Sequence, residues 1–169
     1  QVLRARKFLK KRYGKIYIQF NEPISVNQLL SQHGQLLTEM KSKEINAFIR
    51  NLAYRTINAI NRVTVVTPHG LVAGAILNFS KDKFSRSELL SVLATYTKYL
   101  ATQNAKLADT LVSDQQRAFG KVVESYTRRK FIEALSKGKA ENDTEQKYLI
   151  NEGRRLYLEY YKNTCIAFF

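Results

Sequence analysis

A helical repeat of apolar side chains runs through residues 42–63, SKEINAFIRNLAYRTINAINRV. The members of the repeat are Ile45, Phe48, Ile49, Leu52, Thr56, Ile60 and Val63. Their spacing alternates near three and four residues over five turns, which places them on one face of a helix. The sequence therefore predicts a long amphipathic helix over residues 42–63.

Capping signals predict one helix before this stretch and one after it. Ser25 is expected to cap a short helix over 26–31, which ends at Gly34. Thr67 and Pro68 are expected to start another helix, because a proline at the first helical position loses a donor that has no partner there. The buried face expected for this second helix consists of Leu71, Val72, Ala75, Ile76 and Phe79.

Three more helix starts are predicted in the second half of the chain. The segments 85–88 (SRSE) and 113–116 (SDQQ) both match a capping box, and apolar residues follow each at helical spacing. Asn151 is expected to cap a last helix. The apolar and aromatic residues of that last helix are Leu156, Tyr157, Tyr160, Tyr161 and Cys165. A packed aromatic core is favoured for its tyrosines over a site at a membrane interface.

Strand signals are fewer than helix signals. Within residues 15–20, Ile16, Ile18 and Phe20 alternate with polar or amphipathic residues, which predicts a strand that the long helix covers. A hairpin is expected between 130–135 and 148–150, with a polar loop over 136–146. The predicted fold class is therefore α+β and predominantly helical, with 15–20 as the clearest strand.

The chain is strongly basic, with 28 Lys and Arg residues against 14 Asp and Glu and a formal net charge of +14. The densest cations precede the first acid, Glu22, and they are Arg4, Arg6, Lys7, Lys10, Lys11 and Arg12. Such a balance favours a polyanionic partner, and we expect these six residues to contact phosphate groups or an anionic membrane. A solvated helix face is the alternative.

A self-contained catalytic or metal site is not expected in this sequence. Neither His33 nor His69 has a carboxylate five residues later, and Cys165 is the single cysteine. One cysteine and two histidines cannot form a Cys/His zinc site, and no glycine-rich phosphate loop occurs. We therefore expect no metal and no cofactor. The longest apolar stretch, 71–77, is far shorter than the roughly 20 residues of a membrane-spanning helix.

Three stretches together resemble the region that follows the catalytic motifs of glycerol-3-phosphate 1-O-acyltransferases. The first is RKFLKKRYGKIYIQFNEPIS at 6–25, where Asn21 replaces the family's usual glycine. The second is LAYRTINAINRV at 52–63, with VTP at 66–68 and LVAGAIL at 71–77. The third is LEYYKN at 158–163, where Thr164 follows in place of a common asparagine. Together they span nearly the whole chain.

The resemblance implies that this chain is a C-terminal fragment, with every catalytic residue upstream of Gln1 and the fragment alone inactive. Residues 1–25 would end the acyltransferase α/β domain, and 26–169 would form a helical C-terminal region. The family's His-x4-Asp pair and its glycerol-phosphate-binding arginines would lie upstream. The resemblance further implies an acyl-CoA or acyl-carrier-protein donor, glycerol-3-phosphate as acceptor, and association with the cytoplasmic face of a membrane.

Two other classes of function remain open at this point. Helices over 85–101 and 113–127 followed by a hairpin could form a winged-helix, nucleic-acid-binding module. Against this, the second helix presents only Arg117, Lys121, Arg128 and Arg129 outward, which is few for reading a groove. A helical membrane-surface domain without activity is the third possibility.

Overall fold

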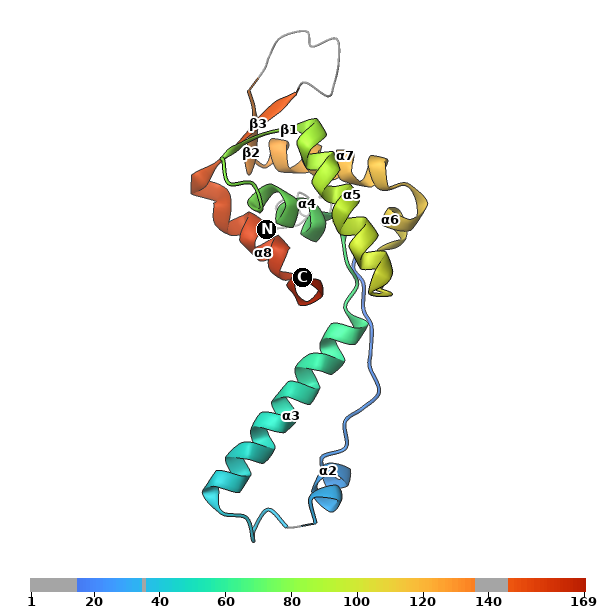
Figure 1. The fold of residues 1–169 in the computed structure, drawn as a ribbon, viewed down its shortest axis with the longest axis vertical. Coiled ribbons are helices and arrows are strands. Elements are labelled where there is room, and N and C mark those ends of the chain that lie inside the picture. Colours follow the sequence, from blue (N-terminus) through green and yellow to red (C-terminus); the bar gives the residue numbers. More distant parts are fainter. Residues whose placement is uncertain (1–14, 35, 136–145) are drawn as a thin grey trace, which may run out of the picture.

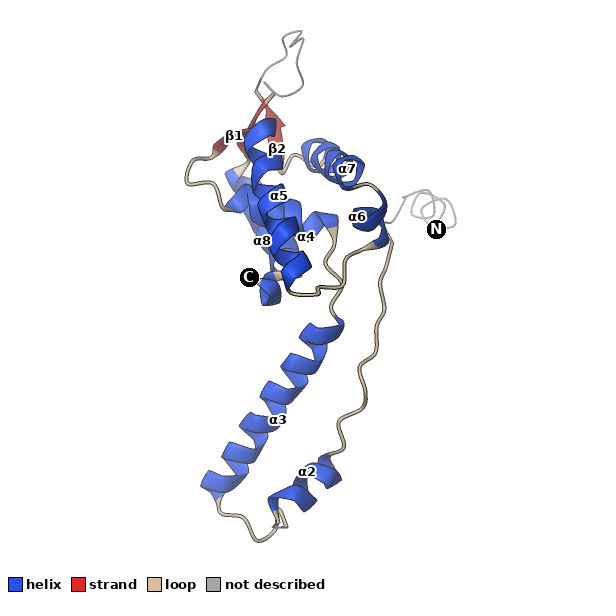
Figure 2. Cartoon of the chain, turned by 45° about the vertical axis from the view of Figure 1, so that its right-hand side comes forward, coloured by secondary structure: helices blue, strands red, loops and turns tan. Residues whose placement is uncertain are grey.

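The computed structural model describes residues 15–34, 36–135 and 146–169 of the chain. Helices dominate, and a single small antiparallel sheet is present among these residues. The predicted class, α+β and predominantly helical, is therefore confirmed. The helices divide into an arm, residues 15–64, and a larger module, residues 65–169, and the arm projects from the end of the module opposite to the sheet (Figures 1 and 2).

The arm contains two helices, both at the positions that the sequence predicts. In α2 (Val26–His33), the Ser25 hydroxyl accepts a hydrogen bond from the Gln28 amide at 3.3 Å. Gly34 ends α2 with a φ of 74°, a left-handed conformation that glycine adopts without strain. The long helix α3 spans Ser42–Val63, and at its start the Glu44 carboxylate accepts from the Lys41 amide at 2.8 Å. An extended segment runs from the module to α2, and α3 returns to the module.

The module consists of helices around a small sheet. Its elements are α4 (Pro68–Leu77), β1 (Lys83–Ser85), α5 (Arg86–Thr102), α6 (Asp109–Ser113), α7 (Gln115–Arg128), β2 (Ile132–Ala134), β3 (Lys147–Ile150), the 3-10 helix η2 (Glu152–Arg154), α8 (Arg155–Asn163) and the 3-10 helix η3 (Ile166–Phe168). Thr67 caps α4 as predicted, since its hydroxyl accepts from the Gly70 amide. Ser85 and Glu88 form the predicted capping box of α5.

The core of the module forms around α4. This helix packs against α5, α7 and α8, and five of its ten residues are apolar and buried: Leu71, Val72, Ala73, Ala75 and Ile76. Because α4 is apolar on nearly every side, it needs cover on every side, which is the pattern of a central helix. The predicted apolar face of α7 is also buried: Phe119, Val122, Val123 and Tyr126.

The sheet confirms the predicted hairpin and adds a strand that the sequence did not indicate. Its order is β1-β3-β2, and all neighbours are antiparallel. Phe84 lies opposite Tyr148 and stacks on it and on Phe79, with ring centroids 5.6 and 5.2 Å away. The order of α4, β1, α5, α7, β2 and β3 along the chain, with this sheet order, is the connectivity of a winged helix, to which α6 is added.

The predicted strand over 15–20 is wrong. Residues 15–25 adopt no regular secondary structure, and α3 does not cover their apolar side chains. Ile16, Ile18 and Phe20 are 82, 73 and 89% exposed. Alternation of apolar and polar residues is necessary for a half-buried strand, but a ladder partner is needed as well, and no described segment supplies one. The proposed division of the chain near residue 25 stays a prediction.

Two predicted helix caps are displaced. Asp114 caps α7 in place of Ser113, because its carboxylate accepts from the Arg117 amide at 2.9 Å. Asn151 precedes η2 and not α8, and its side chain donates to Glu133 at 3.3 Å. At α7 the neighbouring Asp114 takes the cap, whereas at α8 the N-cap residue is Arg154, which makes no side-chain cap hydrogen bond.

Candidate functional site

The extended segment of the arm is fastened to the module by a polar clamp, which consists of Lys15, Tyr17 and Asp109. The Lys15 ammonium donates to one carboxylate oxygen of Asp109, and the Tyr17 hydroxyl donates to the other at 2.5 Å. These two hydrogen bonds, that of Lys15 first, lower the pKa of Asp109 to about 2. The carboxylate therefore stays ionised at neutral pH and holds two residues that are more than 90 positions away in the sequence.

Three chain segments meet beside this clamp: residues 15–19, 65–66 and 106–109. Lys106 donates to the Gln19 side chain at 3.1 Å. The Val66 amide donates to the Lys106 carbonyl at 2.8 Å, and the Ala108 amide donates to the Val66 carbonyl at 2.9 Å. The residues that precede α6 therefore contact both the incoming segment and the chain that leaves α3. An open hollow of about 570 Å³ lies here, lined in part by Tyr17, Val65 and Val112.

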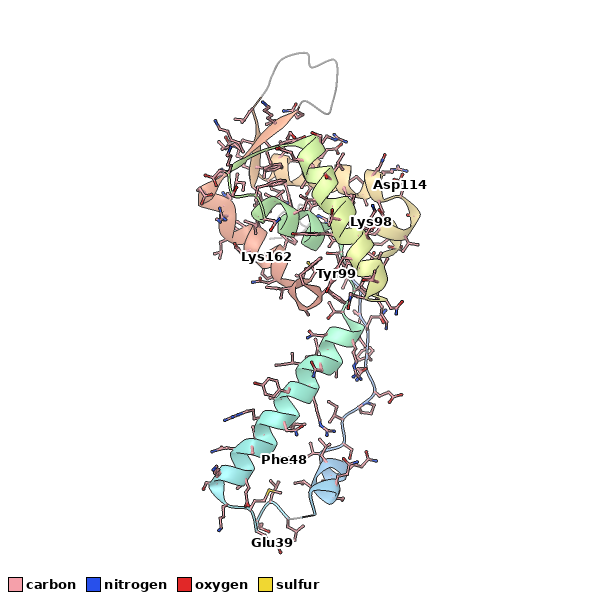
Figure 3. All side chains as sticks on the ribbon, in the orientation of Figure 1. Glu39, Phe48, Lys98, Tyr99, Asp114 and Lys162 are labelled. Atoms are coloured by element: carbon pink, nitrogen blue, oxygen red, sulfur yellow. The ribbon has the colours of Figure 1, made fainter. Side chains whose placement is uncertain are left out.

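The arm carries an apolar surface that the described residues leave uncovered. Phe48, which lies on the side of α3 toward α2 (Figure 3), is the only residue of α3 that is fully buried. Ile49, Ile57 and Ile60 are 55, 53 and 57% exposed. Apolar residues gathered over several turns of an exposed helix mark an interaction site more often than an isolated exposed residue does. The predicted repeat of α3 is therefore present, but the described residues cover only part of it.

His69 belongs to an aromatic cluster and not to a catalytic pair. Its ring lies 5.8 Å from the Tyr126 ring and 5.4 Å from the Tyr161 ring, measured between centroids. The Tyr126 hydroxyl donates to the His69 carbonyl at 2.8 Å. Burial, and then the positive charge of Arg129, lower the pKa of His69, so the imidazole is neutral at pH 7. A neutral half-buried histidine at this place packs α4 against α7 and α8.

Cys165 is a packing residue. It is 2% exposed, and burial raises the pKa of its thiol to about 11, so the reactive thiolate is scarce at neutral pH. Within the described ranges, no group of three or more His, Cys, Asp or Glu side chains could hold a metal ion. No described helix is both long and apolar enough to cross a bilayer.

The six cations predicted to contact phosphate or membrane, Arg4, Arg6, Lys7, Lys10, Lys11 and Arg12, lie outside the described residues. The aromatic residues of the last helix are divided between surface and interior. Tyr161 is half-buried in the His69 cluster, whereas Tyr157 and Tyr160 are 47 and 70% exposed. The clamp is the feature that sequence reasoning missed, because no local pattern links residues 15–17 with residue 109.

The family description "Glycerol-3-phosphate acyltransferase C-terminal region" matches residues 1–169. The chain belongs to this family. A glycerol-3-phosphate acyltransferase of Pasteurella multocida is 29% identical over 116 residues, which are 66% of this chain and 14% of the relative. One of Xylella fastidiosa, strain M12, is 30% identical over 100 residues, or 56% of this chain and 12% of the relative. A putative acyltransferase of Mycobacterium bovis is 25% identical over 158 residues, or 92% of this chain and 23% of the relative.

The chain matches less than a quarter of the length of these relatives. No solved structure matches it. The family assignment agrees with the resemblance seen in 52–63, 66–68, 71–77 and 158–163. These stretches form the end of α3, the start and body of α4, and α8. The stretches 66–68, 71–77 and 158–163 thus lie in the module, whereas 52–63 lies in the arm.

Proposed function

We propose that this chain is the C-terminal part of a glycerol-3-phosphate 1-O-acyltransferase. Such an enzyme transfers a fatty acyl group from an acyl thioester to glycerol-3-phosphate, the first step of phospholipid biosynthesis. The observation that carries the proposal is the family match over residues 1–169, together with relatives of that name. Acyl-CoA and acyl-carrier protein are both suitable thioester donors.

The catalytic residues are proposed to lie upstream of Gln1. In the resembling family a histidine, with an aspartate five positions later, acts as general base on the acceptor hydroxyl. His33 is followed at that position by Thr38 and His69 by Gly74. His69 also packs against the rings of Tyr126 and Tyr161, which supports a structural role for it. We propose that this chain supports catalysis by the upstream residues and has no acyltransferase activity alone.

The arm is the proposed contact with the upstream domain. Its apolar surface, Ile49, Ile57 and Ile60, is about half exposed here, and burial of the exposed half of such a side chain is favourable by roughly 1 kcal/mol. The clamp fixes the segment through which the chain enters this region, so the upstream domain would emerge beside the module. Both features suit a region that holds the catalytic domain in place.

Association with the cytoplasmic face of an anionic membrane is proposed for the same protein. The net charge of +14 supports it, as does the cluster of six cations in residues 4–12. The winged-helix connectivity alone does not favour nucleic acid, because one fold serves many functions. The outward cations of α7 are few, and the three relatives named above are all called acyltransferases.

Acyl transfer by two proteins tests the proposal. The longer protein that contains this chain should acylate glycerol-3-phosphate with a long-chain acyl thioester, and the 169-residue chain should give only background rates. A variant of the longer protein without the histidine of its His-x4-Asp motif is the control and should be inactive. Turnover by the 169-residue chain would contradict an upstream catalytic site. No turnover by the longer protein with either thioester would contradict the proposed activity.

A further inference from the structure

The outward face of α8 is unusually apolar for an exposed surface. Leu156, Tyr157 and Tyr160 are 79, 47 and 70% exposed, whereas Leu158 of the same helix is fully buried. Leu156 and Tyr160 are four residues apart and therefore adjacent on the helix surface. In Figure 1, α8 forms the outer edge of the module on the left. Leu158 thus anchors a helix whose other side presents one leucine and two tyrosines to the outside.

Two arginines contact aromatic side chains of α8. The Arg129 guanidinium donates to the Tyr161 hydroxyl at 3.1 Å, and Tyr161 is next to Tyr160, with ring centroids 5.8 Å apart. The Arg154 guanidinium carbon lies 5.5 Å from the centroid of the Tyr157 ring. Phe131 stacks on Tyr157 at 5.1 Å and so joins α8 to the turn after α7. That turn contains three consecutive cations, Arg128, Arg129 and Lys130.

These cations lack acidic partners among the described residues. The acids near α8 are engaged elsewhere: Glu152 and Glu159 pair with Arg155, Glu159 also pairs with Lys162, and Glu133 accepts from Asn151. Asp82 lies within 3.9 Å of Arg155. No described carboxylate lies within 4 Å of Arg128, Arg129, Lys130 or Arg154. Arg154 thus lies at an exposed ring of α8, and Arg128, Arg129 and Lys130 directly precede Phe131, which stacks on the same ring.

We propose that this surface is a contact site for an anionic lipid bilayer. We name it the α8 patch: Leu156, Tyr157 and Tyr160 with Arg128, Arg129, Lys130 and Arg154. Tyrosine is stable at the boundary between headgroups and acyl chains, leucine enters the acyl region, and Arg and Lys pair with lipid phosphates. The inference rests on the proposed function in one respect, that the protein works at a membrane.

A lipid surface fits the patch better than a protein does. A protein partner that neutralised these cations would have to place carboxylates at fixed positions opposite three consecutive residues, Arg128, Arg129 and Lys130. Anionic headgroups diffuse in the plane of the bilayer and can pair with any arrangement of cations. Because α8 has only nine residues, the contact is shallow and places the module beside the bilayer, not across it.

A tryptophan reporter tests the site directly. The chain contains no tryptophan, so Tyr160→Trp introduces a single reporter into the 169-residue chain. With vesicles of phosphatidylcholine and phosphatidylglycerol, its emission should shift to the blue and be quenched by brominated acyl chains. With phosphatidylcholine alone, or in high salt, both effects should vanish. The matched control is Tyr54→Trp on α3, where the tyrosine is 64% exposed, and this reporter should stay in water.

Charge variants test the cations of the patch. Each cation near an anionic bilayer changes the partition coefficient about five-fold, so Arg129→Gln, Lys130→Gln and Arg154→Gln together should weaken binding about a hundred-fold. The control variant Lys98→Gln, Arg117→Gln and Lys121→Gln removes the same net charge from α5 and α7. It should weaken binding by less than about ten-fold, because only long-range attraction changes.

Two results with the reporters would overturn the α8 patch: absence of vesicle binding, or quenching of the Tyr54→Trp reporter in place of the Tyr160→Trp reporter. Equal loss of binding in the two charge variants, or binding that does not depend on lipid charge, would overturn it as well. A fifth result would show that a protein occupies the patch. If the Tyr160→Trp emission in the longer protein is already blue-shifted without lipid, the upstream domain covers the patch. Acyl transfer by the longer protein is measured separately, so failure of the patch leaves the proposed activity intact.

Discussion

Adding one methyl group at Gly70 should separate α4 from α8, whereas adding it at Gly74 should not. A Cβ atom at Gly70 would lie 2.9 Å from Thr164 Oγ1, 3.0 Å from Cys165 Sγ and 3.2 Å from the Tyr161 carbonyl oxygen. Neither side chain can simply turn away, because Thr164 donates to the Tyr161 carbonyl at 2.7 Å and Cys165 donates to the Lys162 carbonyl at 3.2 Å. The end of α8 must therefore retreat from α4.

Two opposing effects set the expected change in the free energy of unfolding for each substitution. Overpacking of this kind reduces the free energy of unfolding by about 1–3 kcal/mol. The higher helix propensity of alanine offsets up to about 1 kcal/mol, and less at Gly70, because this is the third residue of α4 and lies in its first turn. At Gly74 the nearest atoms to a new Cβ are 3.7 and 3.8 Å away, an ordinary contact distance. Gly74→Ala should therefore stabilise the chain by up to about 1 kcal/mol.

Urea unfolding, followed by far-ultraviolet circular dichroism, measures both variants. Gly70→Ala should lower the midpoint and Gly74→Ala should raise it, with the slope unchanged in both. The opposite signs are the test, because a general effect of alanine in α4 would move both midpoints the same way. If Gly70→Ala is as stable as the wild type or more stable, the close approach of α4 and α8 is not as described.

Two further predictions concern the arm. Asp109→Asn should speed tryptic cleavage after Lys15, because the clamp that holds this side chain loses its charge. Since hydrogen bonds lower the pKa of Asp109 to about 2, the clamp is complete above the unfolded pKa near 3.8 and is lost as the pH falls through about 2. An unchanged rate of cleavage at Lys15 in Asp109→Asn at pH 7 would refute it. Ile60→Ala should change the free energy of unfolding of the 169-residue chain by less than about 0.5 kcal/mol, because this side chain is exposed there. In the longer protein the same substitution should lower the free energy of unfolding by about 2 kcal/mol or more, and thermal unfolding of both proteins measures the difference. Equal effects in the two proteins would exclude a contact of Ile60 with the upstream domain.

Local signals predicted most of the helices. The bounds of α3 follow from its repeat, and Thr67 with Pro68 marks the start of α4, since caps and propensities act within a few residues. The start of α7 was missed by one residue because Ser113 and Asp114 are both good caps. Ser113 is the last residue of α6, so the cap of α7 passes to Asp114, and the sequence pattern did not indicate α6.

Contacts between distant residues were not predictable from these patterns. The strand predicted over 15–20 had the right alternation, but the structure ties this segment to Lys106 and Asp109 through side chains. β1 has only three residues and directly precedes a capping box, so it shows no periodicity of its own. The resemblance to a family, which depends on residue identities and not on periodicity, was the stronger guide to function.

The meeting of three chain segments next to Thr64 makes α3 a lever. Its 22 residues extend about 33 Å from the module, and α2 is carried at the far end. A rotation of about 10° at the pivot would move that end by about 6 Å, while the paired residues Val66 and Leu107 stay in place. A partner that bound the exposed isoleucines of α3 would therefore fix the angle between α3 and the module. The distance between α2 and the module would change with that angle.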